Sequence, residues 1–116
     1  MDINTDYRIN NVTVSTNGRN EIYFDVEWEG DENLDYFELR ILESGVDNNL
    51  EVYAYPTHNQ RVVVKDYYFL KDWKSGEENS ESFVVELGIA QYTDEGKQLS
   101  WKVLAAYEPI NIVLYY

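Results

Sequence analysis

Strict alternation of apolar and polar residues over Glu21 to Glu29, EIYFDVEWE, is the feature that most restricts the fold of this chain. Successive side chains of a β-strand point to opposite faces, so an alternating segment buries one side and wets the other. The apolar set is Ile22, Phe24, Val26 and Trp28, and the polar set is Tyr23, Asp25, Glu27 and Glu29. We therefore predict a half-buried strand here.

The same period of two recurs along the chain, and no window shows a sustained helical period. It predicts further strands over 9–15, 35–42, 50–55, 60–65, 83–92, 99–107 and 110–116. Turn-forming residues separate these segments, for example Asn17-Gly18 and Glu108-Pro109. Asp66 to Leu70 either continues a strand or turns a corner, and the polar segment 71–82 is predicted to be a loop. Seven to eight short strands in 116 residues indicate a single all-β domain, an antiparallel β-sandwich spanning 1–116.

The order of the landmarks resembles that of a fibronectin type III domain. An early strand carries a core Trp28, and the next opens with Phe37 followed by alternating apolar residues. Leu70 before a loop, the alternating strand from Phe83, and the turn glycine Gly96 follow in the family's order. The resemblance covers about residues 9–114, nearly the whole chain. It implies a binding or spacer module without catalysis, and it names no partner.

Two departures from that family's pattern leave a second sandwich type open. Phe83 stands where the family usually has Tyr, and the loop over 71–82 is longer than the family's short turn. An immunoglobulin-like sandwich of different strand order is the alternative.

Composition limits the classes of function. Hydrophobic residues make up 44% of the chain, enough for a core, and there is no cysteine for a disulfide or a thiolate metal site. The formal net charge is −13, from 22 acids and 9 bases, which disfavours direct binding to nucleic acid or an anionic membrane and would attract a basic partner. The start, MDINTDYRIN, has no basic or apolar run, so no signal peptide is predicted, and no stretch is apolar enough for a membrane helix.

No set of residues points to catalysis. His58 is the only histidine, it falls in an expected loop, and no serine has the flanking glycines of a nucleophile elbow. Asp31-x-Asn33-x-Asp35 resembles half of a calcium loop, but Tyr36 and Leu42 occupy the positions where that loop needs Gly and Glu. We therefore predict no enzyme, no cofactor and no metal site, and an ordinary turn at Asp31 to Asp35.

Three features suggest contact with a protein partner. Tyrosines on the polar faces of strands are frequent at interfaces, and acidic residues on the same faces would meet either water or a basic partner. The C-terminal segment INIVLYY is apolar on nearly both faces, so it is either a central strand or an edge covered by another chain. The residues predicted to meet a partner are Tyr23, Tyr36, Tyr115, Tyr116, Ile112, Leu114, Glu27 and Glu29.

These features favour a non-enzymatic module that docks on a larger protein assembly. A bias toward Asn and Tyr is typical of AT-rich genomes, so its concrete form is an accessory, decoration-type protein of a phage particle, or a bacterial surface adhesion domain. The alternative is an acidic inhibitor that mimics nucleic acid and occupies a basic groove of a host defence protein; it requires one contiguous acidic face. A third hypothesis, a sugar-binding sandwich, rests on Trp73 and Trp101 near loops.

Overall fold

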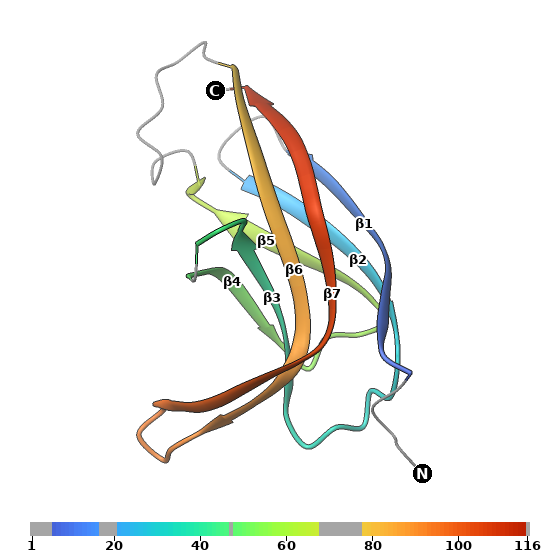
Figure 1. Cartoon of the computed structure of the whole chain (residues 1–116), viewed down its shortest axis with the longest axis vertical. Coiled ribbons are helices and arrows are strands. Elements are labelled where there is room, and N and C mark those ends of the chain that lie inside the picture. The colour runs from blue at the N-terminus through green and yellow to red at the C-terminus, as the bar shows by residue number, and fades with distance from the viewer. Residues whose placement is uncertain (1–5, 17–20, 47, 68–77, 116) are drawn as a thin grey trace.

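Two antiparallel sheets make up the part of the chain that the structure describes (Figure 1). The computed structural model describes residues 6–16, 21–46, 48–67 and 78–115. The three-stranded sheet has the order β1-β2-β5 and the four-stranded sheet the order β4-β3-β6-β7. The strands are β1 (Arg8–Thr16), β2 (Glu21–Glu29), β3 (Phe37–Glu43), β4 (Asn49–Ala54), β5 (Asn59–Lys65), β6 (Glu78–Tyr92) and β7 (Gln98–Tyr115). The predicted all-β, sandwich-like architecture is confirmed.

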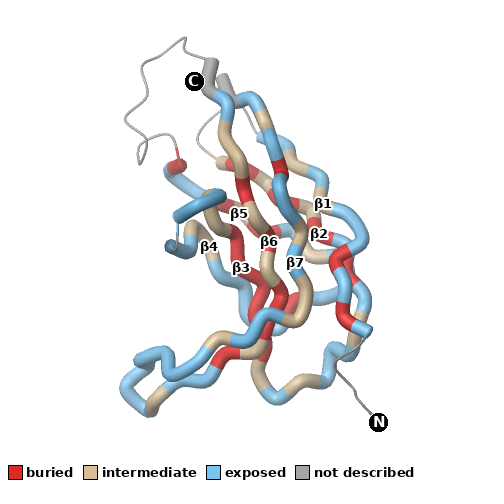
Figure 2. The backbone as a smooth tube through the Cα atoms, in the orientation of Figure 1, coloured by how far each residue is buried: buried red, intermediate tan, exposed pale blue. Residues whose placement is uncertain are grey.

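The alternating strand β2 lies at the centre of its sheet, between β1 and β5. Its bounds and its two faces are as the sequence predicts, with the four apolar residues buried. They pack against the inward-facing residues of β3, β5 and β6 to form one core between the sheets (Figure 2). The largest fully buried side chains include Trp28, Phe24, Phe37, Phe83 and Tyr67.

Strands β6 and β7 differ most from the prediction, because together they form one long hairpin. β6 begins at Glu78, where a loop was predicted, since the far end of β7 gives its polar residues a partner: Glu78 lies opposite Tyr115. The two predicted strands at 99–107 and 110–116 are a single strand. Pro109 is accommodated at a register irregularity. Among the described strands β7 pairs only with β6, so the missing N–H of the proline breaks no second ladder there.

The C-terminal strand lies at a sheet edge. β7 is the last strand of the four-stranded sheet, so the first alternative for INIVLYY, a central strand, is wrong. Ile110 is buried and Ile112 packs against the core, while Val113 between Ile112 and the C-terminal end is exposed. The β1 strand of the other sheet approaches β7 (Figure 1).

Several predicted features fall outside the described residues: the Asn17-Gly18 turn, Leu70, Trp73, most of the predicted loop at 71–82, and Tyr116. Asp66 has a positive φ of 58°, so the backbone leaves the path of β5 there and turns. Across the described ranges, the structure contains no helix of the length and apolar character needed to cross a membrane.

Candidate functional site

The acidic outer face of β2 is interleaved with bases from its two neighbours. Arg61 on β5 lies directly opposite Asp25 and donates to it at 2.7 Å. Arg8 on β1 lies opposite Glu29 and donates to it at 2.8 Å. This pairing follows from the strand register, which places an acid and a base side by side on one face. The three-stranded sheet therefore presents a charge-paired polar face.

Tyr23 and Glu27, two of the predicted partner-binding residues, lie on this same outer face. The Arg61 guanidinium carbon is 4.9 Å from the centre of the Tyr23 ring, and the Tyr23 hydroxyl donates to Glu21 at 3.4 Å. Glu27 is exposed and lies opposite Asn59. The hydrogen bond from Arg61 lowers the pKa of Asp25, which keeps this carboxylate charged.

The outer face of the four-stranded sheet holds a buried ion pair, Glu38 with Arg40. Both residues alternate with the core residues of β3, so they point away from the core, yet they are only 1% and 4% exposed. Arg40 donates to one carboxylate oxygen of Glu38 from Nε at 2.9 Å and from Nη2 at 2.7 Å. The alternation in Phe37 to Ile41 places Glu38 on the outer face, yet there the side chain is buried against Arg40.

Four further side chains enclose the pair, and together they form the Glu38–Arg40 cluster. Tyr36 and Tyr92 donate to the second oxygen of Glu38 at 2.7 and 2.6 Å. Gln98 accepts from Arg40 at 2.7 Å. The Trp101 ring covers the guanidinium, with its centre 3.6 Å from the Arg40 carbon. Both charges are thus hydrogen-bonded, as buried charges require.

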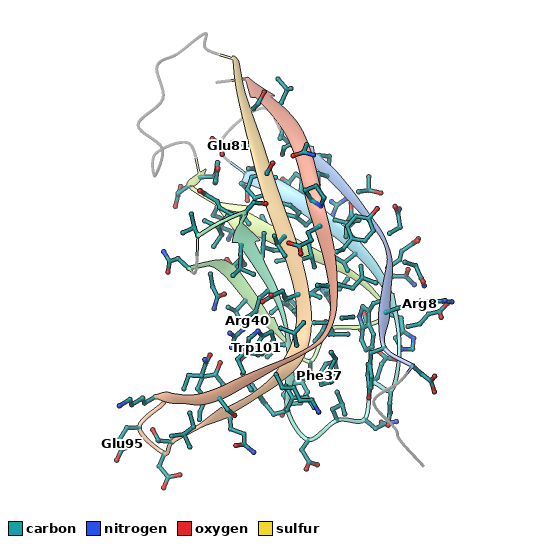
Figure 3. The ribbon with its side chains drawn as sticks, viewed as in Figure 1. Arg8, Phe37, Arg40, Glu81, Glu95 and Trp101 are labelled. Carbon is teal, nitrogen blue, oxygen red and sulfur yellow. The ribbon has the colours of Figure 1, made fainter. Side chains whose placement is uncertain are left out.

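Three members of the cluster, Tyr92, Gln98 and Trp101, come from one hairpin arm, residues 90–101. This arm extends past Phe37, the first residue of β3. β3 ends its pairing with β6 at Ile89, and the arm then bends away from the sheet (Figure 1). Gly88 permits the bend: a Cβ there would lie 2.4 Å from the Lys102 carbonyl oxygen and 2.7 Å from the Trp101 ring. Trp101 therefore lies across Gly88. It reaches Arg40, and the two labelled residues lie close together in Figure 3.

The cluster shifts the pKa values of its acidic groups in opposite directions. Burial alone would raise the pKa of Glu38, but the hydrogen bonds from Tyr92, Tyr36 and Arg40, with the charge of Arg40, bring it below the usual value of a glutamate side chain. The hydrogen bond to Glu38 and burial raise the pKa of Tyr36, and burial with the same carboxylate raises that of Tyr92. Glu38 is therefore an anion and both phenols are neutral donors at neutral pH. These protonation states keep the hydrogen bonds of the cluster in place.

Around this cluster, the outer face of the four-stranded sheet carries a set of aliphatic side chains, with the polar residues Ser80, Ser82, Glu86 and Asn111 between them. The register places Val52 opposite Arg40, Val84 opposite Leu42, and Val103 opposite Gly88, so these side chains share one face. We name this surface the aliphatic face; it comprises Leu42, Val52, Ala54, Val84, Val103, Ala106 and Val113. Val52, Val103 and Val113 are 37%, 42% and 47% exposed.

The two sheets differ sharply in what they expose. Within the described part of the chain, the large apolar side chains left exposed all lie on the four-stranded sheet or in loops at its ends. They are Val46, Val52, Tyr53, Tyr55, Tyr92, Leu99, Val103 and Val113. The outer face of a sandwich sheet normally carries polar residues, as the three-stranded sheet does here. An aliphatic outer face is typical of a surface that another molecule covers.

A shallow hollow of about 290 Å³ opens in this face beside the β3–β4 loop. Its floor and walls contain the apolar side chains of Leu42, Val46 and Val84. Its described lining also includes three carboxylates, from Glu43, Glu86 and Glu108, and no basic residue. Glu86 accepts a hydrogen bond from the Trp101 indole at 3.2 Å, so the cluster and the hollow adjoin.

The residues predicted to meet a partner do not form one site. Tyr23, Glu27 and Glu29 lie on the outer face of the three-stranded sheet, whereas Tyr36 belongs to the Glu38–Arg40 cluster. Ile112 packs against the core from β7. The backbones of Leu114 and Tyr115 extend β7, but their side chains and all of Tyr116 lie outside the described residues.

His58 and the Asp31 turn have structural roles. The His58 ring packs edge-on against Trp28 with ring centres 4.6 Å apart, and its Nε2 is 2.8 Å from the Gly30 carbonyl oxygen. The Asp31 carboxylate accepts from the Asn33 backbone N–H at 2.8 Å, which is the local bond of a turn. Among the described residues, no group of three or more His, Cys, Asp or Glu side chains is placed to hold a metal ion.

Sequence reasoning missed the partners of Glu38, although it contained a signal for them. In Phe37-Glu38-Leu39-Arg40, the glutamate and the arginine are two residues apart. In a strand this spacing places both side chains on one face, where they can form an ion pair. The burial of that pair required the fold of the hairpin arm, whose residues are about 50 positions away.

Comparisons of the chain with protein-family models, with curated proteins and with solved structures find no match.

Proposed function

We propose that this protein is a non-enzymatic interaction module that docks on a larger protein assembly through the aliphatic face. The observation that carries the proposal is the contrast between the two sheets: exposed apolar side chains gather on the four-stranded sheet, while the three-stranded sheet is polar and charge-paired. Burying apolar surface at roughly 25 cal/mol per Å² drives most protein association. The exposed valines would contribute most on binding.

The rigidity of this face supports a docking role. The buried ion pair, its hydrogen bonds and Trp101 tie the hairpin arm to β3, so the surface around Val103 is organised before any partner arrives. Preorganised surfaces lose less conformational entropy on binding.

For the fold type we propose a fibronectin type III sandwich. The alternative, a constant-type immunoglobulin sandwich, would place the fourth strand in the same sheet as the first, second and fifth. Here β4 pairs with β3 in the other sheet, which favours the fibronectin type III assignment. The core positions of Trp28, Phe37 and Phe83 also agree with the landmarks of that resemblance.

The concrete form that we propose is an accessory, decoration-type protein of a phage particle or a bacterial surface adhesion domain. Its support is the compositional bias together with an exposed aliphatic face on a small, acidic domain. The acidic inhibitor is less favoured, because bases on β1 and β5 pair with the acids of β2.

Size fractionation of the native source tests the function. The chain should migrate with a large assembly, and Val103→Asp, placed on the aliphatic face, should release it into the monomer fraction. The matched control is Val63→Asp on the outer face of the three-stranded sheet, which should remain with the assembly. A wild-type chain that migrates alone as a monomer would refute the proposal.

A further inference from the structure

The hollow beside the β3–β4 loop gives the aliphatic face a chemical preference. We propose that this face binds a protein surface on which aliphatic residues flank a lysine or arginine side chain, and that the hollow receives that basic side chain. This inference rests on the proposed function and names the chemistry of the partner.

The lining of the hollow suits the two parts of a basic side chain. Lysine and arginine carry an apolar stem and a charged head, which prefer different surroundings. Leu42, Val46 and Val84 can contact the stem, while the carboxylates of Glu86 and Glu108 stand near enough to line the same space. A charge-assisted contact between the cation and these carboxylates would add specificity to the apolar contact.

The overall charge agrees with this assignment and argues against a second copy of the chain. Each chain carries a formal net charge of −13, so two aliphatic faces brought together would also bring two strongly negative molecules together. A basic partner is instead attracted over the Debye length of about 8 Å at physiological salt. The aliphatic face supplies contact area, and the carboxylates that line the hollow favour a positively charged partner.

The outer face of the three-stranded sheet provides the contrast within the same molecule. It also has a hollow, lined by Asp25, Val26, Glu27, Asn59, Gln60 and Arg61. In that hollow the lining itself contains a base, Arg61, which pairs with Asp25 at 2.7 Å. The hollow beside the β3–β4 loop has no such base among the residues that line it.

A peptide probe and amide chemical shifts test the inference. The probe is acetyl-Lys-Val-Lys-Val-Lys-amide, with matched peptides in which Glu replaces each Lys or Ser replaces each Val. We expect only the Lys–Val peptide to saturate, with shifts at Val46, Val84 and Val103. Glu108→Gln should weaken binding of the Lys–Val peptide about two- to fivefold. Val46→Ser should weaken it more than Glu108→Gln does. Val63→Ser, on the other sheet, should leave the affinity unchanged.

Three outcomes would overturn the inference. They are equal binding of the Lys–Ser peptide, shifts centred on β1, β2 and β5, and a dimer of the free chain that Val103→Asp dissolves. The last would assign the aliphatic face to a second copy. If the chain still migrates with its native assembly but neither salt nor Glu108→Gln changes that association, the docking function stands and the basic partner is wrong.

Discussion

The Arg40 guanidinium carbon lies 3.6 Å from the centre of the Trp101 ring, although the two residues belong to different strands, β3 and β7, that are not neighbours in the sheet. β6 separates them, and Gly88 on β6 lets the indole cross over it. This contact, with the bonds from Arg40 to Glu38 and Gln98, fixes the hairpin arm to the sheet. The stability of the arm and the shape of the aliphatic face therefore depend on one buried cation.

Removing that cation should destabilise the protein strongly. Arg40→Met keeps most of the side-chain volume but leaves the Glu38 carboxylate buried without its ion-pair partner, at a cost of about 3–5 kcal/mol in the free energy of unfolding. Urea unfolding would measure it. The matched control is Arg61→Met, because its ion pair with Asp25 is exposed; that change should cost under about 1 kcal/mol.

Replacing both partners should cost less than replacing one. In Glu38→Met with Arg40→Met no charge remains buried, and apolar replacement of a buried pair is often neutral or better. We expect the double variant to be more stable than Arg40→Met alone. A double variant less stable than either single variant would mean that the pair contributes net stability, contrary to this interpretation.

The cluster should make stability sensitive to acid. Because the folded pKa of Glu38 lies below its unfolded value, the carboxylate contributes stability that is present above the unfolded pKa and is lost as pH falls through the folded pKa. Stability should therefore decline as the pH falls below the ordinary pKa of a glutamate side chain. Tyr92→Phe removes one donor to Glu38, raises its pKa and moves the decline to higher pH. Tyr53→Phe, an exposed tyrosine, should leave the curve unchanged.

Adding one methyl group at Gly88 should disturb the bend. The new Cβ would meet the Lys102 carbonyl oxygen, which is backbone and cannot turn aside, so we expect Gly88→Ala to cost about 1–3 kcal/mol. Thermal unfolding would report it. The new Cβ would also meet the Trp101 ring. Adding Trp101→Ala removes that clash but not the one with the Lys102 carbonyl oxygen, so the double variant should be less stable than Trp101→Ala alone. Ser15→Ala, on an exposed position of β1, serves as a neutral control.

Loosening the cluster should free the arm before it affects the rest of the fold. Gln98→Ala removes the acceptor that Arg40 reaches across from β3, and local opening costs less than global unfolding. Amide hydrogen exchange in the arm, residues 90–101, should accelerate several-fold, while exchange in β2 stays unchanged. Uniform acceleration in both regions would show that the arm has no independent motion.

The core of this protein could be predicted from its sequence because its signal is local. The alternation in Glu21 to Glu29 alone assigns every inward residue of β2, and the structure confirms each of them. Phe37, Leu39 and Ile41 follow in the same way. A period of two decides the face on which a side chain lies, and in these strands the inner face is the buried one.

The cluster could not be predicted in this way, since facing outward does not fix exposure. Glu38 and Arg40 are buried because residues about 50 positions later fold over them, which depends on the bend at Gly88 and on the register of β6 with β7. Strand β7 was predicted as two pieces for a related reason: Pro109 ends a central strand but is tolerated where only one neighbour pairs. Sheet order is a property of the whole chain.

The most direct test of the docking surface compares amide hydrogen exchange of the free chain with that of the chain in its native assembly. Amide protection should increase on binding along β4, the β3–β4 loop and the part of β7 around Val103, which form and border the aliphatic face. It should not increase along β1 and β5, whose outer side is polar. Protection confined to β1, β2 and β5 would contradict the account.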